Sequence, residues 1–531
     1  MAVTDLSLQP TSRVDFISLF SMPGYELESI VGTTYCLNYE TLLMLILGAV
    51  YGPGADQAME HHSGEINPGA IFAAIERLKG KLKVYCQIDK IDMGSTDQNK
   101  SKEIQKIKSL LDEFIEPVPM KKIGNSFSSF HPKIWQICFK TKDGERKQRF
   151  AVTSRNLTSN RDFDAVAVFE QEQENPLPLS PDSDFFKKNS FPVTEEYLRE
   201  CHSVISPFLD AKLLKSNFPK LNIFSLRSEI DKVWKASPDL LKRYDFYYIN
   251  PALEAAGESG HSSIHAKLYI GEKSLILGSS NFTYRGWYQN REFNVKLDRG
   301  IEKEKLLKQL TENSGGIFVP YTPPSDSADI PEDQKETLLQ ELACLSLEAS
   351  WTNGELSLQL INPFKLDLSI FQWKPFFAPG NEWKNFPELK WELDAKDVCK
   401  IFLCKVNSQE ILMMASLTGN TGSLWNSRFA EATKILTLSE ELEYRILMAE
   451  SAEEIFGRDV PLKRDNHSGN KTQTPPRPPI FERLLKMKHD ELERFFSGDF
   501  KIRENDSDPL GLVQAFYELK AFFGFGTERE K

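Results

Sequence analysis

The stretch HAKLYIGEKSLILGSSNFT, residues 265–283, decides how this chain is interpreted. It starts with His265-Ala266-Lys267, passes through two apolar segments separated by a charged turn, and reaches Gly278-Ser279-Ser280-Asn281. Side chains two residues apart on a strand point to the same face, so the histidine and the lysine should project together. An antiparallel partner strand would return the serine and the asparagine beside them. The stretch therefore predicts a hairpin that gathers an imidazole, an ammonium, a hydroxyl and an amide.

A looser copy of this pattern occurs earlier in the chain, in HPKIWQICFKTKDGERKQRFAVTSRNLT, residues 131–158. It contains His131-Pro132-Lys133 and Thr153-Ser154-Arg155-Asn156. Lysine to asparagine is 23 residues here and 14 in the later copy, a difference that fits a longer hairpin around Gly144. The two histidines are 134 residues apart, which fits a duplicated lobe. Two facing copies would place two imidazoles around one donor-rich pocket.

The residues around both copies alternate between strand-like and helix-like segments. Asn38 is a good N-cap for a helix with apolar positions at Leu42, Leu45 and Ile46. Alternation of this kind favours a layered α/β fold. We expect helices over 102–114 and 229–236, and strands over 31–37, 83–88, 134–139, 150–152, 222–225, 244–249, 266–270 and 274–277.

The pattern changes after Ala343, where apolar and polar residues alternate over 345–349, 356–360 and 366–370. Period-2 alternation with short turns predicts a β-sandwich-like domain. Prolines at 475, 476, 478 and 479 exclude a helix there and indicate a semi-rigid linker. We expect loops at 171–189 and 318–332, and five parts in all: a first lobe (1–185), a second lobe (186–325), a β-rich domain (337–464), a Pro-rich linker (465–479) and a helical tail (480–531).

The paired motifs suit cleavage of a phosphodiester. One neutral imidazole can attack phosphorus and form a phosphohistidine, while the other gives a proton to the leaving oxygen and then activates water. The lysines and asparagines can hold the non-bridging oxygens as negative charge builds. We expect no metal and no other cofactor, because Lys133 and Lys267 supply the positive charge.

The paired motifs resemble those of the phospholipase D superfamily, in particular the tyrosyl-DNA phosphodiesterase branch and bacterial nuclease-like members. The resemblance covers about residues 30–300 and is closest in the second copy, with Asn290-x-Glu292 downstream. The first copy departs from the commonest pattern: it has Thr-Ser-Arg-Asn, and only Asn160-x-Asp162 or Asp164 as an acidic partner. The resemblance implies two α/β/α sandwich lobes related by a pseudo-twofold axis. It also implies catalytic His131, Lys133, Asn156, His265, Lys267 and Asn281, with Ser154, Ser279, Glu292 and Arg155 orienting them or binding substrate.

Composition narrows the setting of this chemistry. The net charge of the 531 residues is −11, which argues against a general nucleic-acid coat protein. Between Lys121 and Arg161, however, ten Lys or Arg residues face two acidic ones, and this basic excess could attract a polyanion to the first motif. The alternative is a solvated hairpin turn. Seven scattered cysteines without a Cys-x-x-Cys pair favour free thiols in a reducing cytoplasm. The chain shows neither a signal peptide nor a membrane-spanning run, so we expect a soluble cytoplasmic protein.

Three functions fit the sequence. The leading one is a nuclease acting on DNA or RNA; family analogy places it in a bacterial restriction or antiphage defence system, with a helicase or another defence subunit as partner. The second is a phospholipase or phosphatidyltransferase, although no amphipathic membrane anchor is evident. The third is a catalytically idle nucleic-acid-binding subunit. Family habit favours His131 as nucleophile and His265 as acid.

Overall fold

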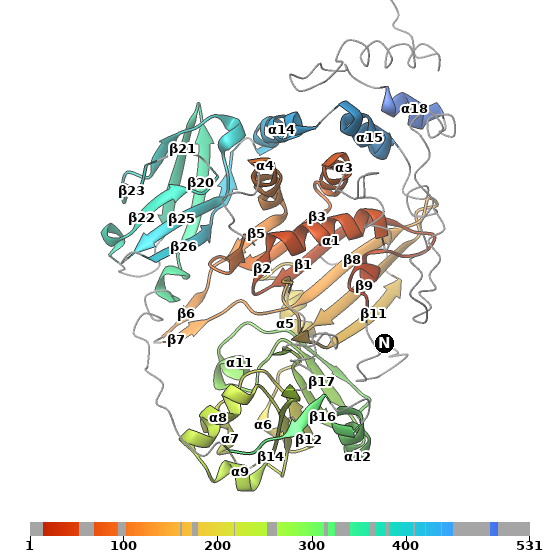
Figure 1. Ribbon diagram of the computed structural model, residues 1–531, viewed down its shortest axis with the longest axis vertical. Helices are drawn as coiled ribbons and strands as arrows, with labels where there is room; N and C mark the ends of the chain where they lie inside the picture. The colour runs from red at the N-terminus through yellow and green to blue at the C-terminus, as the bar shows by residue number, and fades with distance from the viewer. Residues whose placement is uncertain are drawn as a thin grey trace, which may run out of the picture.

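The computed structural model describes sixteen segments of the chain (Figure 1). They are residues 14–52, 68–93, 102–124, 126–159, 162–172, 179–216, 218–251, 263–312, 317–323, 340–361, 367–377, 382–406, 409–419, 421–436, 438–449 and 489–496. The expected Pro-rich linker and most of the expected helical tail lie outside these residues; within the tail, α18 (His489–Phe495) is helical.

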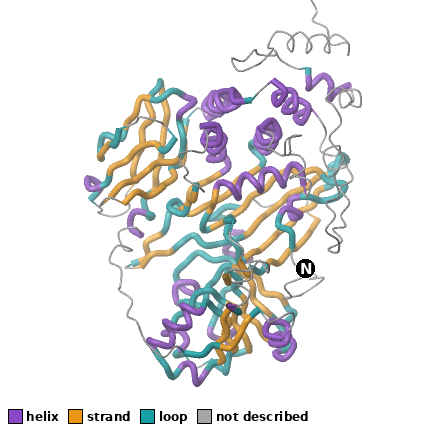
Figure 2. Tube along the Cα trace, in the orientation of Figure 1, coloured by secondary structure: helices purple, strands orange, loops and turns teal. Residues whose placement is uncertain are grey.

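The part of the chain that carries the two motifs has two halves, one built on a sheet over residues 26–172 and the other on a sheet over residues 201–320. The first half forms a six-stranded sheet in the order β11-β9-β8-β1-β3-β5. Strands β1, β3 and β5 are parallel, and β8, β9 and β11 continue the sheet antiparallel. Helices α1 (Tyr39–Tyr51), α3 (Pro68–Leu78) and α4 (Lys102–Leu111) lie on one side of this sheet (Figures 1 and 2). The strands are β1 (Glu26–Thr34), β3 (Leu82–Gln87), β5 (Ile115–Val118), β8 (Ile134–Lys140), β9 (Arg146–Thr153) and β11 (Val166–Glu172).

A second sheet repeats this order as β18-β17-β16-β12-β13-β14, with β19 added at the edge. Its parallel and antiparallel pairs correspond one to one with those of the first sheet. The strands are β12 (Cys201–Ile205), β13 (Asn222–Phe224), β14 (Asp245–Ile249), β16 (Leu268–Gly271), β17 (Leu275–Gly278), β18 (Asn294–Leu297) and β19 (Phe318–Pro320). Phe318 therefore belongs to a strand paired with β14, and not to the loop expected there.

The two sheets pack against each other through one apolar core. Ile134 and Phe150 of the first sheet share this core with Leu268 and Leu277 of the second. The opposite face of the second sheet is covered by a separate core with helices α6 (Glu195–Leu198), α7 (Ala211–Leu214), α8 (Arg227–Ala236), α9 (Leu240–Arg243) and α11 (Tyr284–Tyr288). Helix α5 (Asp184–Asn189) falls inside the segment expected to be a loop, and its Phe186 packs into the shared core.

The β-rich part consists of two four-stranded sheets, β24-β21-β20-β27 and β23-β22-β25-β26. Leu347 and Leu356 of one sheet share a core with Trp373 and Phe402 of the other, so the two sheets form a sandwich. The strands are β20 (Ser346–Thr352), β21 (Glu355–Ile361), β22 (Gln372–Pro375), β23 (Lys384–Asn385), β24 (Lys390–Glu392), β25 (Ile401–Val406), β26 (Gln409–Met414) and β27 (Ser416–Thr418). The alternation at 366–370 was misleading, because Leu368–Ile370 forms a 3-10 helix.

The described segments that follow the sandwich are helical, so within the described residues the expected β-rich character stops at Thr418. Helices α14 (Thr421–Ala432) and α15 (Leu438–Ala449) lie beside α4 and α3 of the first half (Figure 1). Arg428 of α14 makes a fully buried ion pair with Asp112. This pair joins residues far apart in the sequence, and nothing in the local pattern predicts it.

Candidate active site

Each predicted motif lies where the two strands of a hairpin begin and end. His131 and Lys133 directly precede β8, and Ser154 and Asn156 directly follow β9. The two segments meet because β8 and β9 are antiparallel; the Thr153 N–H donates to the Lys133 carbonyl over 2.9 Å. The second motif repeats this layout on β16 and β17. All six residues predicted to be catalytic thus lie at corresponding edges of the two sheets, although each His-x-Lys lies just before its strand.

Backbone pairs join the two halves at this edge. The His131 N–H donates to the Arg291 carbonyl over 2.9 Å, and the Arg291 N–H donates back to Ser129 over 2.9 Å. On the other side, β10 (Asp162–Phe163) runs parallel to β15 (Ser263–Ile264), and the His265 N–H donates to the Phe163 carbonyl over 3.0 Å. Each histidine segment is therefore held by the half of the molecule that it does not belong to.

The carboxylates follow the same crossed arrangement. Glu292, from the second half, accepts from Nδ1 of His131 over 2.8 Å. The same carboxylate oxygen accepts from the Ser279 hydroxyl, and the other oxygen accepts from Asn290 Nδ2 over 3.2 Å. An ionised carboxylate only accepts, so the Nδ1 atom of His131 carries the proton and Nε2 keeps its lone pair. Glu292 thus orients the imidazole of the opposite motif.

Asp164, from the first half, is the corresponding partner of His265. Its Oδ1 atom lies 3.3 Å from His265 Nδ1 and accepts from the Ser154 hydroxyl over 3.0 Å. Its Oδ2 atom lies 3.7 Å from Nη1 of Arg155. Of the two candidates in the sequence, Asp164 therefore takes this position; Asp162 pairs with β15 as part of β10.

Both lysines are buried and carry strongly perturbed pKa values. Burial, followed by the charge of Lys267, lowers the pKa of Lys133 well below its usual range. Burial also lowers the pKa of Lys267 from 10.5 to about 8, against the raising effect of Asp164 and Glu292. Each ammonium donates to the carbonyl two residues earlier, over 3.0 Å to His131 and 2.6 Å to His265. A bound anion would raise the pKa values of both lysines again, because a nearby opposite charge favours the protonated amine.

Burial also lowers the pKa of both imidazoles. For His131 the charge of Glu292 opposes this effect. For His265 the pKa falls to about 3, because burial is reinforced by the charge of Lys267. Both rings are therefore neutral near pH 7 in the absence of a ligand, and a neutral imidazole with a free Nε2 is a nucleophile.

Two further features of the site point toward a ligand. The Oδ1 atoms of Asn156 and Asn281 are buried and have no hydrogen-bond partner among the described residues, which is rare for buried polar groups. The ring of Tyr35 lies 4.9 Å from the ring of His131, and the ammonium of Lys133 lies 5.9 Å from the Tyr35 ring centroid. The motifs did not predict Tyr35; its place directly after β1 was the available signal, since residues following parallel strands often line a site.

Apart from Lys133 and Arg155, the described basic residues between Lys121 and Arg161 do not surround the site. The β8–β9 turn lies at the opposite end of the strands from His131, roughly 20 Å away at about 3.3 Å per residue. Arg146 is paired with Glu28 over 2.7 Å, and Arg149 with Glu170 over 2.6 Å. Lys121 and Lys122 are paired with Asp182 and Glu341. The expected basic field around the first motif is therefore wrong for these residues.

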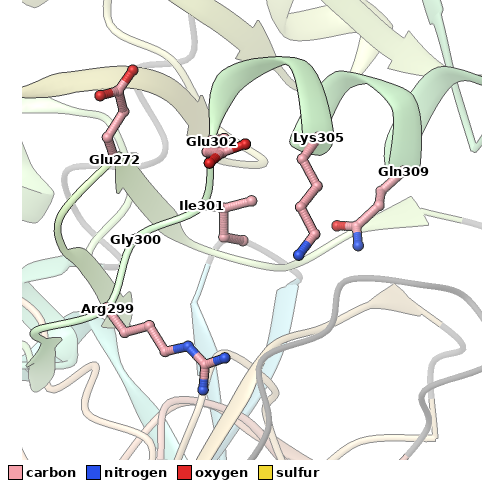
Figure 3. Close-up of a pocket in the computed structure, with 7 residues that line it drawn as sticks. All are labelled: Glu272, Arg299, Gly300, Ile301, Glu302, Lys305 and Gln309. Carbon is pink, nitrogen blue, oxygen red and sulfur yellow. The ribbon is translucent and has the colours of Figure 1, made fainter.

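Other features bear less on the site. A pocket of about 280 Å³, lined by Glu272, Arg299 and Lys305 among others (Figure 3), lies at the β16–β17 turn and thus at the far end of these strands from His265. Within the described residues, no group of three or more His, Cys, Asp or Glu side chains is placed to bind a metal ion. Among the described helices, none is long and apolar enough to cross a membrane. A scan against protein-family models and a search of curated proteins each found no match for the chain.

Proposed function

We propose that this chain is a phosphodiesterase of the phospholipase D type that cleaves nucleic acid through a phosphohistidine. The observation that carries the proposal is the crossed arrangement of the site, in which each imidazole is held by a carboxylate from the other half. Two histidines with a purely structural role would seldom each have a carboxylate partner beside two buried lysines. The site thus joins two potential nucleophiles, each oriented by a carboxylate, to two buried lysines.

The first chemical step is attack by Nε2 of His131 on phosphorus. The bond from phosphorus to the leaving oxygen breaks, and protonated His265 gives its proton to that oxygen. The phosphorylated imidazole is positively charged, and the carboxylate of Glu292, 2.8 Å from Nδ1, offsets this charge. In the second step neutral His265 takes a proton from water, the hydroxide attacks phosphorus, and His131 leaves.

In this proposal, the negative charge that develops on the phosphoryl group lies between Lys133, Lys267 and the side-chain amides of Asn156 and Asn281. Their hydrogen bonds to the non-bridging oxygens would strengthen in the transition state, where these oxygens carry more charge. The same anion would raise the pKa of His265 above its ligand-free value of about 3, because a negative charge favours the imidazolium. Substrate binding would thus supply the acid that the first step of the mechanism needs, the protonated imidazole of His265.

The direct test is incubation with single- and double-stranded DNA and RNA in the presence of EDTA, with phosphatidylcholine vesicles as a separate arm. We expect cleavage of at least one nucleic acid by the wild type, no head-group release, and loss of cleavage in His131→Ala and His265→Ala. The proposal would be rejected if no nucleic acid is cleaved, or if both variants cleave as fast as the wild type. Head-group release alone would transfer the same chemistry to a lipid substrate.

A further inference from the structure

A cavity of about 500 Å³ adjoins the first half of the site. This volume is within the roughly 300–1,000 Å³ of small-molecule pockets. Arg155 and Asn156 of the first motif form part of its wall, so the cavity and the site share residues. The second motif contributes no residue to it. A substrate group that entered this cavity would therefore be attached close to the phosphate that the site holds.

One wall of the cavity is apolar and firmly packed. It is formed by Phe16, Ile17, Trp135 and Leu157. The Trp135 ring is fixed beneath Gly32, where a Cβ atom would lie 2.3 Å from the ring, and Phe16 meets it edge to face at 5.5 Å. A preformed wall that includes aromatic rings suits a flat apolar group, and the faces of nucleobases bind to such surfaces with little dependence on sequence.

The opposite side of the cavity is polar, with one cationic side chain, Arg155, and one anionic side chain, Asp15. The guanidinium of Arg155 lies 3.7 Å from Asp164 and donates to the Thr158 carbonyl over 3.0 Å. The buried Oδ1 atom of Asn156 has no hydrogen-bond partner within the part of the chain that the structure describes. Thr41 lines the cavity in the first turn of α1, whose N-terminus carries partial positive charge. Among the described lining residues Asp15 carries the opposing charge, and its Oδ1 atom accepts from the Ile17 N–H over 3.1 Å.

We propose that this cavity binds the nucleotide next to the scissile phosphate of a single-stranded nucleic acid. The base lies against the apolar wall, and Arg155 contacts the adjoining phosphate. A base in a duplex is stacked and paired, so only an unpaired base enters such a cavity. The inference rests on the proposed phosphodiesterase function and specifies its substrate class.

The test compares three small diesters: the p-nitrophenyl esters of thymidine 5′-phosphate and of thymidine 3′-phosphate, and methyl p-nitrophenyl phosphate, which lacks a nucleoside. We expect the wild type to have a higher kcat/KM for one thymidine ester than for the methyl ester. Thr41→Phe fills the cavity and should reduce this preference about 10-fold, mainly through KM, since stacking one base is worth roughly 1–3 kcal/mol. Met44→Phe is the matched control: Met44 is on the same helix, is 40% exposed and does not line the cavity.

A second variant shifts the result in the opposite direction. Asp15→Asn removes the opposing charge while it keeps an oxygen for the Ile17 N–H, so KM for the preferred thymidine ester should fall about 2-fold. Fluorescence anisotropy with labelled oligonucleotides adds a readout without turnover. We expect single strands to bind more tightly than duplexes, and Thr41→Phe to weaken single-strand binding while Met44→Phe leaves it unchanged.

The outcomes separate the subsite from the chemistry. Hydrolysis of the methyl ester without any preference for a thymidine ester overturns the subsite and leaves the phosphodiesterase intact. An unchanged preference in folded Thr41→Phe, as judged by its melting curve, also overturns it. If Thr41→Phe does not fold, unchanged kinetics and unchanged single-strand binding in Asp15→Asn overturn it instead. Hydrolysis of none of the three esters removes the proposed function and the subsite with it.

Discussion

The two histidine–carboxylate pairs are built alike but differ in how firmly the carboxylate holds the ring. Glu292 lies 2.8 Å from His131, and its other contacts come from neutral donors, Ser279 and Asn290. Asp164 lies 3.3 Å from His265 and has a cation, Arg155, within 3.7 Å. After burial, the main influence on the pKa of His131 is the charge of Glu292, whereas for His265 it is the charge of Lys267.

This difference suggests separate roles for the two rings. A ring held by a close carboxylate tolerates positive charge, which the phosphorylated imidazole carries. A ring whose cationic form is disfavoured releases its proton readily, as a general acid must. The comparison therefore agrees with the proposed roles of His131 as nucleophile and His265 as acid.

Removal of either ring should have the largest effect. We expect His131→Ala and His265→Ala each to lower kcat by about 10⁴-fold or more, and the double variant to be little worse, because residues that act as a unit are not additive. The measurement is hydrolysis of a p-nitrophenyl diester. Independent, multiplying losses in the double variant would show that the two rings do not share one reaction.

The same variants separate the roles. With p-nitrophenol as a good leaving group, His265→Ala should still be phosphorylated, and it should accumulate the intermediate on His131 because the base for water is missing. The reaction is quenched rapidly without acid, and mass spectrometry of the peptides then locates the phosphoryl group. A phosphoryl group on His265 of the His131→Ala variant, and none on His131, would reverse the assignment.

The carboxylates should differ in the same direction as their distances. Glu292→Gln keeps the shape but can present an N–H to His131 and so favour the wrong tautomer; we expect kcat to fall about 10³-fold, toward the roughly 10⁴-fold known for such a change. Asp164→Asn should cost less, about 10–100-fold, as for other groups that orient a ring. Equal losses in kcat would mean that the difference between 2.8 Å and 3.3 Å has no functional meaning.

Local spacing was enough to predict which motif residues come together, because each set lies at the open end of one antiparallel hairpin. It could not predict the crossed pairing. Glu292 was recognised as an orienting group, but the imidazole that it orients, that of His131, is 161 residues away and in the other half of the molecule. The choice between Asp162 and Asp164 depended on whether residues 162–163 form a strand that pairs with the other half of the molecule, and no local pattern decides this.

The errors have a common physical origin in contacts between distant segments. The basic excess seemed uncompensated because Glu28, the partner of Arg146, is 118 residues away. Helices α14 and α15 follow strands without a break in composition, and their position is fixed by packing on α3 and α4 and by the Arg428–Asp112 pair. Strand β19 is only three residues long, so its pairing with β14 gives almost no periodic signal.

The lysines should show a conflict between stability and activity. The fall in the pKa of Lys267 from 10.5 to about 8 corresponds to roughly 3 kcal/mol at about 1.4 kcal/mol per pH unit. Lys267→Met should therefore raise the free energy of unfolding at pH 7 by about 1–3 kcal/mol, reduced by the attraction that Asp164 and Glu292 lose when the ammonium is removed. The same change should lower kcat about 10²–10³-fold. The gain should shrink between pH 8 and 10.5, where the folded wild type loses its proton and the unfolded chain keeps it. Urea unfolding at pH 7 and 10 measures both effects; a destabilised variant at pH 7 would contradict them.

Acid sensitivity should give the smallest effect and should distinguish the two rings. The pKa of His265 is about 3 in the folded protein and 6.5 in the unfolded chain, so the unfolded state binds the proton first as pH falls. Stability is then unaffected above pH 6.5 and falls below it, by about 2 kcal/mol at pH 5. His265→Asn keeps a donor to Asp164 but does not titrate. The stability lost between pH 7 and 5 should therefore be about 2 kcal/mol smaller in this variant than in the wild type.

His131→Asn is the matched control. The charge of Glu292 opposes the lowering of the pKa of His131, so its replacement should change the acid dependence less than replacement of His265. Urea unfolding of the wild type and both variants at pH 7 and 5 gives the two differences directly, and the other titrating groups cancel in the comparison. If His131→Asn removed the larger share of acid sensitivity, His265 would be the ring that holds positive charge more easily, and the roles of nucleophile and acid would have to be exchanged.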